Sequence, residues 1–187
     1  MATNTSAAIR DFEVYLLMTM KPRLALADTW GLLDAKLAKA AISISGAKRI
    51  SDRISQALSH EASRFRDLTA LLEVADAHVT SVSYHSVLWP GWNFSARASS
   101  NGGLESAGYT HLEHAALSVE SPTHLAPWSV DIREFDELFG PSTVRDKRAL
   151  FDTILPAYEE YEFSWNGDRY GARFLWGLFL SSSAYWE

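Results

Sequence analysis

The fold prediction depends most on residues 165–180, WNGDRYGARFLWGLFL. This stretch contains a sequence typical of a β-turn, and the residues on both sides of that turn alternate between hydrophobic and other types. Asn166-Gly167 is the strongest short hairpin signal in the sequence, since both residues tolerate a positive φ. Large hydrophobic residues alternate with other residues over 161–165, before this turn, and again over 170–180, after it. We therefore predict a β-hairpin whose return strand, 170–180, lies in the centre of a sheet.

The second face of that return strand is mixed and contains Gly171 and Gly177. Glycine within a strand allows another backbone or side chain to approach closely. We expect the helical half of the chain to occupy this space, with a binding partner as the alternative. The stretch also carries Asp168, Arg169 and Arg173 and is shorter than the roughly 18 apolar residues of a membrane span, so it is not an anchor.

The first 76 residues have the apolar periodicity of helices. A first helix is predicted to end at Pro22, because proline disfavours helical geometry in the residue before it. A second helix is predicted from Pro22 to Ile44 with Gly46 as its C-cap, and a third from about Ser51 to Ala75. The last two, joined by a short glycine-containing turn, predict an αα-hairpin.

The rest of the chain, residues 77–187, is richer in β-branched and aromatic residues, which favour strands. Strands are predicted within 78–88, 92–98 and 109–120, and short helices over 129–140 and 141–155. The fold class predicted is α+β, with N-terminal helices (αα-hairpin) packed on a largely antiparallel β-sheet that includes the C-terminal Asn-Gly hairpin. We expect a single domain over 1–187, with a helical part (1–76) and a β-rich part (77–187).

The sequence contains no cysteine, which excludes disulfides, thiolate metal sites and a cysteine nucleophile. The N-terminus lacks the basic leader of a secretory signal. No apolar run approaches the length of a membrane span. These features predict a soluble, cytoplasmic protein that does not act in a membrane.

Charge is unevenly distributed along the chain. Residues 1–76 carry 10 Lys/Arg against 9 Asp/Glu, whereas residues 77–187 carry 7 against 14, within a total net charge of −6. An acidic half repels phosphate backbones, so general nucleic-acid binding is not expected. A basic protein surface would be attracted, although such charge also serves solubility.

One histidine-rich segment suggests a metal site. His111, Glu113 and His114 lie within four residues, and His124 follows ten residues later. Neutral imidazole and carboxylate groups are ligands suited to zinc and related divalent metals. The spacing matches neither of the helical zinc motifs His-Glu-x-x-His and His-x-x-Glu-His, so polar residues on a strand or loop are the alternative interpretation.

A second pattern is Arg53 followed by His60 in RISQALSH. On a continuous helix these two side chains would share a face, where arginine could hold a phosphate and histidine act as a general base. The spacing resembles the Arg-x4–6-His element of HEPN-type ribonucleases over eight residues of the chain. Ile54 departs from that pattern, because the family usually has a polar residue there.

Tryptophan occurs seven times, and several of these residues fall in turn-like segments. Trp89 and Trp92 flank a Pro-Gly break, and Trp128 follows a proline. Tryptophans on loops are frequent binding anchors, whereas burial in a tryptophan-rich core is the alternative. We predict a partner-binding site formed by these three residues together with the acidic Glu159 and Glu160.

The sequence lacks nucleotide-binding glycine loops and the serine-hydrolase elbow. We therefore expect a non-catalytic protein-binding protein that needs no cofactor, for example an acidic inhibitor or immunity-type partner of a basic enzyme or toxin. The first alternative is a metal-dependent enzyme that uses the His/Glu cluster, with a divalent metal such as zinc. The second is a structural subunit of a larger assembly, including a homo-oligomer.

Overall fold

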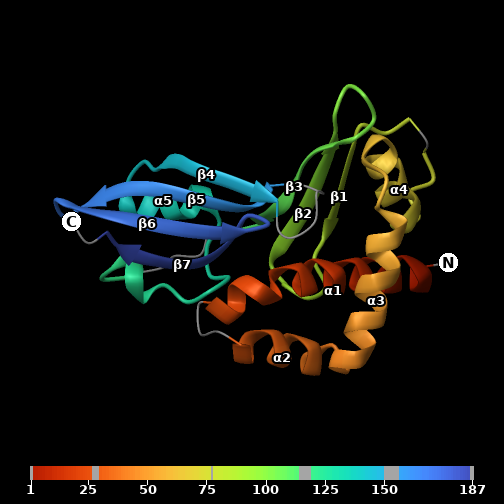
Figure 1. The fold of residues 1–187 in the computed structure, drawn as a ribbon, viewed down its shortest axis with the longest axis horizontal. Helices are drawn as coiled ribbons and strands as arrows, with labels where there is room; N and C mark the ends of the chain where they lie inside the picture. The colour runs from red at the N-terminus through yellow and green to blue at the C-terminus, as the bar shows by residue number, and fades with distance from the viewer. Residues whose placement is uncertain (1, 27–29, 77, 114–118, 150–155, 186–187) are drawn as a thin grey trace. The chain divides into compact units, whose positions relative to one another are not determined.

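The structure is a computed structural model and describes residues 2–26, 30–76, 78–113, 119–149 and 156–185 (Figure 1). The chain divides into two compact units, which we call the N-terminal unit (Met1–Ala107) and the C-terminal unit (Gly108–Glu187). The boundary falls within strand β3. The expectation of a single domain is not tested by this division and stays a prediction.

The N-terminal unit combines helices with an antiparallel β1-β2 pair that continues into β3. Phe12 of α1 packs edge-to-face on Phe94 of β2, with ring centroids 5.4 Å apart. The elements of this part of the chain are α1 (Ala2–Leu26), α2 (Trp30–Lys39), α3 (Ile44–Ala57), η1 (Glu61–Ser63), α4 (Arg64–Leu71), β1 (Ser81–His85), β2 (Trp92–Ala98) and β3 (Leu104–His111).

Glu13 fixes the loop between β1 and β2 to helix α1. Its side chain is fully buried, and its Oε2 accepts hydrogen bonds from the backbone N–H groups of Val87 and Leu88 at 2.9 and 2.7 Å. A carboxylate that receives two backbone donors is stabilised inside the protein, whereas a bare buried charge would be strongly unfavourable.

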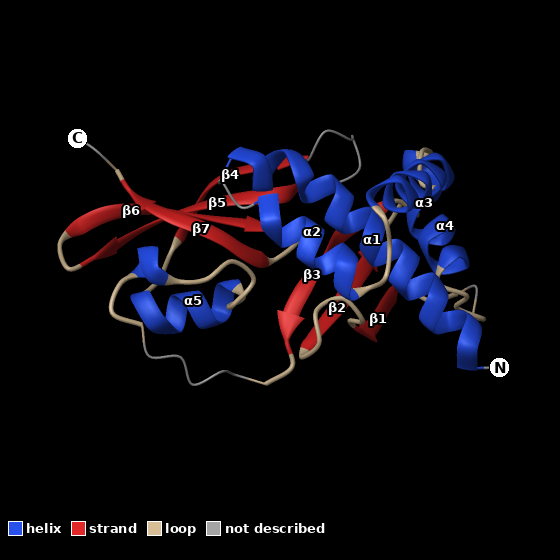
Figure 2. Ribbon diagram, turned by 90° about the horizontal axis from the view of Figure 1, so that it is seen from below, coloured by secondary structure: helices blue, strands red, loops and turns tan. Residues whose placement is uncertain are grey.

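The C-terminal unit is a four-stranded antiparallel sheet in the order β4-β5-β6-β7, with α5 along one face (Figure 2). Phe135 of α5 is the centre of the core, with its ring 4.9 Å from that of Phe163 and 5.7 Å from those of Phe174 and Phe179. The elements are η2 (Pro122–His124), α5 (Ile132–Phe139), β4 (Thr143–Ala149), β5 (Pro156–Trp165), β6 (Asp168–Leu175) and β7 (Leu178–Ala184).

The predicted α+β class, with N-terminal helices and antiparallel pairing, is confirmed, although two sheets replace the one that was expected. Trp165 pairs with Asp168 across the Asn166-Gly167 turn, where φ is 52° and 92°. Both residues therefore have the positive φ that this type of turn requires. No helix within the described residues is both long and apolar enough to cross a membrane.

The predicted return strand is present as the central strand β6, but its predicted extent over 170–180 is wrong, because the chain turns again at Trp176-Gly177. These residues have φ values of 52° and 79° and connect β6 to β7. The turn is held from outside the hairpin, where the N–H of Tyr109 donates to the carbonyl of Trp176 at 2.7 Å. Trp176 is buried, so packing compensates for a conformation that non-glycine residues rarely adopt.

The predicted helix boundaries also need correction. Helix α1 continues through Pro22, because a largely buried stretch before it, which includes residues 12–17, keeps the helix in place despite the missing N–H. The third predicted helix is interrupted between Ala57 and Arg64, and the buried Arg64 donates from Nε to the carbonyl of Leu58 at 3.0 Å. The predicted long αα-hairpin is therefore replaced by shorter helices.

Two further segments differ from their predictions. Gly46 does not end a helix, because Ser43 is the N-cap of α3 and accepts a hydrogen bond from the N–H of Gly46 at 3.1 Å. The helix predicted over 141–155 is a strand, β4, over Thr143–Ala149, while residues 150–155 lie outside the described part of the chain. Backbone pairing with β5 overrides the local preference there.

Candidate functional site

The three tryptophans predicted to bind a partner are buried. Trp89, Trp92 and Trp128 expose 2%, 4% and 9% of their surface. The alternative of a tryptophan-rich core therefore accounts for their position, and none offers an open ring to a partner in this conformation. A role for them in partner binding stays a prediction that would require these buried side chains to become exposed.

The two glutamates of the predicted binding site lie on opposite faces of β5. Glu159 points to the face that carries Tyr161, whose hydroxyl donates to Glu159 Oε2 at 2.8 Å. Burial raises the pKa of Tyr161, and the charges of Glu159 and Asp136 raise it further. Glu160 points to the other face, where the hydroxyl of Tyr158 donates to its Oε2 at 3.0 Å. The predicted pair is thus divided by the sheet.

The face that carries Glu160 holds a connected group of charged and aromatic side chains, which we call the charged face. Glu162 accepts hydrogen bonds from Arg169 Nε at 2.9 Å and from Arg145 Nη1 at 3.3 Å. Arg169 Nη2 also contacts Glu162. The charged face consists of Arg145, Glu160, Glu162, Arg169 and Tyr185.

Tyr185 is the aromatic centre of the charged face. Its hydroxyl donates to Glu160 Oε1 at 3.3 Å, and its ring centroid lies 4.9 Å from the guanidinium carbon of Arg145 and 5.9 Å from that of Arg169. Its backbone N–H donates to the carbonyl of Arg169 at 2.9 Å. Cation–π contacts and hydrogen bonds together hold the ring in one orientation.

Tyr185 also explains Gly171. A Cβ atom at this position would lie 2.7 Å from the Tyr185 hydroxyl oxygen, so a larger residue would force the end of the Tyr185 side chain to shift. At Gly177 a Cβ atom would lie 2.5 Å from the carbonyl oxygen of Tyr109. Within the C-terminal unit, the side chain of Tyr185 and the backbone of Tyr109 therefore lie beside Gly171 and Gly177. The expected approach of the helical half of the chain, or of a partner, stays a prediction.

The charged face is accessible within the C-terminal unit. Helix α5 lies on the opposite face of the sheet (Figure 2), and the side chains of Arg145 and Arg169 are 51% and 59% exposed. The unit as a whole carries 6 Lys/Arg against 13 Asp/Glu, a net charge of −7. A fixed group of arginine and tyrosine side chains therefore lies within a strongly acidic unit.

His111 contacts the residues that cap the start of α5. Its Nδ1 lies 2.6 Å from Glu134 Oε2, and its backbone N–H donates to Asp131 Oδ2 at 3.0 Å. Asp131 and Glu134 form a capping box, in which each side chain accepts the backbone N–H of the other. These contacts connect the end of β3 to the first turn of α5, which is the common role of such a box.

Asp131 supports this connection in its ionised form. Burial opposes ionisation, but backbone donors from Glu134 and His111 and the Arg133 guanidinium at 3.1 Å outweigh it, so the pKa of the Asp131 carboxyl is lowered. A lowered folded-state pKa means that the stabilisation is present above the ordinary pKa of aspartate, about 3.9, and is lost as pH falls through the folded-state pKa.

We expect Asp131→Ala to lower the free energy of unfolding of the C-terminal unit by about 1–2 kcal/mol at pH 7, because the helix loses its N-cap. The difference from the unsubstituted protein should shrink as pH falls below the ordinary aspartate range. Urea unfolding measured at a series of pH values checks this, with the exposed Glu113→Ala as the control. A constant difference down to the most acidic pH would show that the ionised carboxylate is not responsible.

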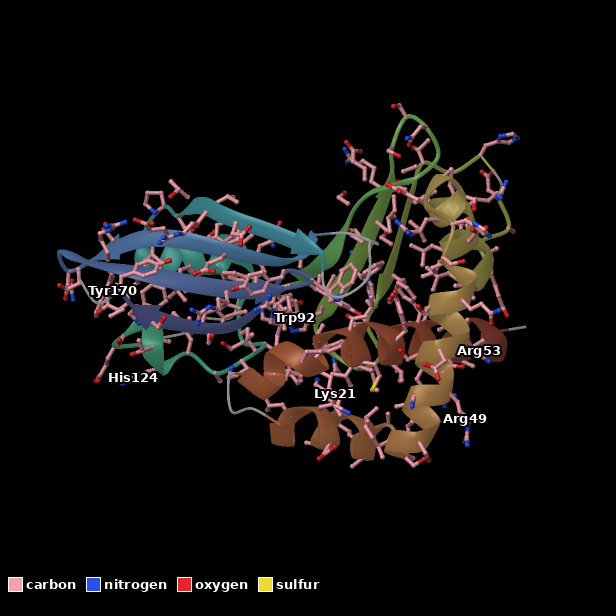
Figure 3. The ribbon with its side chains drawn as sticks, viewed as in Figure 1. Lys21, Arg49, Arg53, Trp92, His124 and Tyr170 are labelled. Carbon is pink, nitrogen blue, oxygen red and sulfur yellow. The ribbon has the colours of Figure 1, made fainter. Side chains whose placement is uncertain are left out.

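The predicted metal ligands are not brought together in the described part of the chain. Glu113 is exposed after the end of β3, His124 is exposed on η2 (Figure 3), and His114 lies outside the described residues. No group of three or more His, Asp or Glu side chains with the geometry of a metal site occurs among the residues the structure describes. His111 instead faces the cap of α5.

Arg53 and His60 do not share a helix face. Helix α3 ends at Ala57, and His60 precedes the short η1 helix. Arg53 is paired with Asp11 of α1, with Nη2 and Oδ2 2.7 Å apart. The resemblance to HEPN-type ribonucleases therefore fails at the residues that suggested it.

The sequence alone predicts only part of the charged face. Glu160 was predicted, but Arg145, Arg169 and Tyr185 were not, because β4 and the end of β7 were not recognised as strands. The alternation of Arg169, Gly171 and Arg173 along β6 was the available signal. No protein-family model, curated protein or solved structure matches this chain.

Proposed function

We propose that this chain is a protein-binding protein, of the inhibitor or immunity type, whose C-terminal unit binds a partner with a basic surface through the charged face. The observation that carries the proposal is the fixed, accessible group around Tyr185. Tyrosine and arginine are enriched among the residues that dominate binding energy at protein interfaces.

Preorganisation supports the proposal. Each oxygen of Glu160 and Glu162 already receives a hydrogen bond from a tyrosine or an arginine, so the side chains are ordered before a partner arrives. Ordering a long side chain on binding costs roughly 0.5–1.5 kcal/mol, and most of this cost has already been met within the fold.

The net charge of the C-terminal unit indicates that its partner has a basic surface. A unit with a net charge of −7 raises the rate of encounter with a basic surface and disfavours acidic ones. Contact would then be made by the exposed arginine stems and the Tyr185 ring, which are less sensitive to salt than the encounter itself.

An assembly built by adding strands at the β4 edge is a weaker candidate. β4 carries irregular pairing between Val144 and Asp146 and between Arg148 and Ala149. Bulges and basic residues on an edge strand oppose pairing with another strand. The charged face is therefore the better-supported surface.

The experiment isolates the tagged full-length chain from its native cells and identifies co-purifying proteins by mass spectrometry. We expect one stoichiometric basic protein. Its affinity for the Tyr185→Ala variant should be about 30-fold lower than for the unsubstituted chain, as for a typical interface hot spot. Arg169→Gln removes the contacts of Arg169 with Glu162 and the Tyr185 ring, so loss of this preorganisation should outweigh the more negative charge and weaken binding about tenfold. It provides a second variant if Tyr185→Ala unfolds. Association should slow as salt is added.

Val144→Ala is the matched control, because Val144 is 51% exposed on the same sheet but is not part of the charged face. It should bind as the unsubstituted chain does. Equal affinity of all the variants, or a partner that binds at a rate independent of salt, would contradict the proposal.

A further inference from the structure

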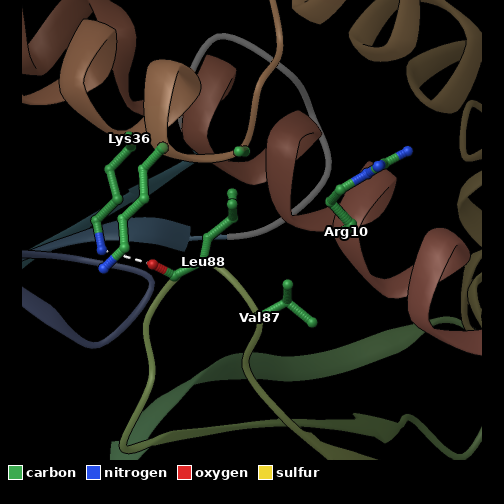
Figure 4. Close-up of a pocket in the computed structure, with 6 residues that line it drawn as sticks. Arg10, Lys36, Val87 and Leu88 are labelled. Carbon is green, nitrogen blue, oxygen red and sulfur yellow. Dashed lines mark hydrogen bonds between the residues drawn. The ribbon is translucent and has the colours of Figure 1, made fainter.

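A small cavity in the N-terminal unit is lined by two lysines of helix α2. It has a volume of about 260 Å³, and Lys36 and Lys39 line it together with Ala40, Val87 and Leu88 (Figure 4). Residues three apart on a helix are neighbours on its surface, so the two ammonium groups belong to one side of α2. The cavity therefore combines two cations with an apolar lining.

Lys36 is held at the cavity by two contacts. Its Nζ donates to the carbonyl of Leu88 at 2.6 Å (Figure 4) and lies 5.1 Å from the ring centroid of the buried Trp89. A carbonyl oxygen and an aromatic face both favour a positively charged group. The cation is thus placed before any ligand binds.

The surroundings of Lys36 disfavour its protonated form. Burial and the charge of Lys39 lower the pKa of Lys36 to about 8, and the buried Glu13 of α1 opposes this only in part. Arg10 also lines the cavity, but its Nη2 is paired with Asp11 at 3.2 Å, and its guanidinium points away from Lys36 (Figure 4). An anion beside Lys36 and Lys39 would relieve their mutual repulsion.

We propose that this cavity binds a small organic oxyanion, a phosphate or a carboxylate with a short apolar group, between the ammonium groups of Lys36 and Lys39. Oxyanions accept short, charge-assisted hydrogen bonds from ammonium groups, and the alanine, valine and leucine side chains accommodate the apolar part. The site lies in the N-terminal unit and is independent of the proposed partner binding.

Calorimetric titration of the full chain tests the proposal, with inorganic phosphate and acetate as separate probes over a chloride background. We expect saturable binding of at least one probe, and the preferred probe distinguishes a phosphate ligand from a carboxylate. Lys36→Met and Lys39→Met should each weaken binding at least about tenfold. Lys48→Met, at an exposed position of α3, should have no effect.

The pH dependence provides an independent measurement. Because Lys36 loses its proton near pH 8 in the unoccupied site, affinity should fall as pH rises through this value. Lys36→Arg, which stays charged, should retain binding at higher pH. Absence of saturation with both probes, or equal binding after both lysines are replaced, would mean an adventitious ion only and would overturn the proposal.

Discussion

Gly177→Ala is expected to destabilise the C-terminal unit by roughly 3 kcal/mol or more. Gly177 has φ +79°, where a Cβ atom alone costs about 1 kcal/mol, and that atom would lie 2.5 Å from the carbonyl oxygen of Tyr109. Because the obstacle is backbone, the β6–β7 turn must separate from Tyr109, which also breaks the hydrogen bond to Trp176. Urea unfolding followed by tryptophan fluorescence measures the loss.

Gly167→Ala is the matched control for backbone conformation. Gly167 has φ +92° in the other hairpin turn, but a Cβ atom there would meet nothing within 4 Å. We expect a loss of only about 1 kcal/mol at this position. Equal losses at the two glycines would show that the contact with Tyr109 contributes nothing.

Glu13→Ala is expected to destabilise the N-terminal unit by roughly 4 kcal/mol. It leaves the buried amide of Leu88 and the part-buried amide of Val87 without their acceptor, and an unsatisfied buried donor costs about 1–3 kcal/mol. The loop between β1 and β2 also loses its connection to α1. Urea unfolding gives the stability, and hydrogen exchange reports whether these two amides lose protection.

Glu13→Gln and Asp11→Ala separate the contributions. Glutamine keeps an acceptor oxygen of the same shape, so its cost should be about 1–2 kcal/mol. Asp11 lies two residues earlier on α1 and pairs with the exposed Arg53, so its loss should cost less than about 1 kcal/mol. A Glu13→Ala variant as stable as Asp11→Ala would contradict the role given to Glu13.

The parts of the fold that were predictable depend on local signals. Asn166-Gly167 tolerates the positive φ values that its turn requires, and the segment over 129–140 forms a short helix that Asp131 caps, so the sequence indicates a turn and a short helix at these places. The sequence does not indicate the Trp176-Gly177 turn, because tryptophan rarely adopts a positive φ and the hydrogen bond that the turn accepts comes from Tyr109, which is distant in sequence. The β4 strand likewise depends on β5, its partner in the sheet, and has no clear alternation of its own.

The candidate site was less predictable than the fold. A net acidic half and Glu160 could be recognised from the sequence, but the charged face requires the register that places Arg145 and Arg169 near the ring of Tyr185. The lysine pair of α2 required the loop that carries Leu88, which follows more than 40 residues later in the chain. Both sites depend on contacts between segments distant in sequence, which periodicity does not reveal.

The central claim is that a basic partner covers the charged face of the C-terminal unit. Hydroxyl-radical footprinting of the full chain, alone and with its co-purified partner, measures this side chain by side chain. We predict that oxidation of Tyr185 falls at least about fivefold in the complex, while the exposed Ile44 and Leu112 change little. Unchanged oxidation of Tyr185 in a saturated complex would contradict the account.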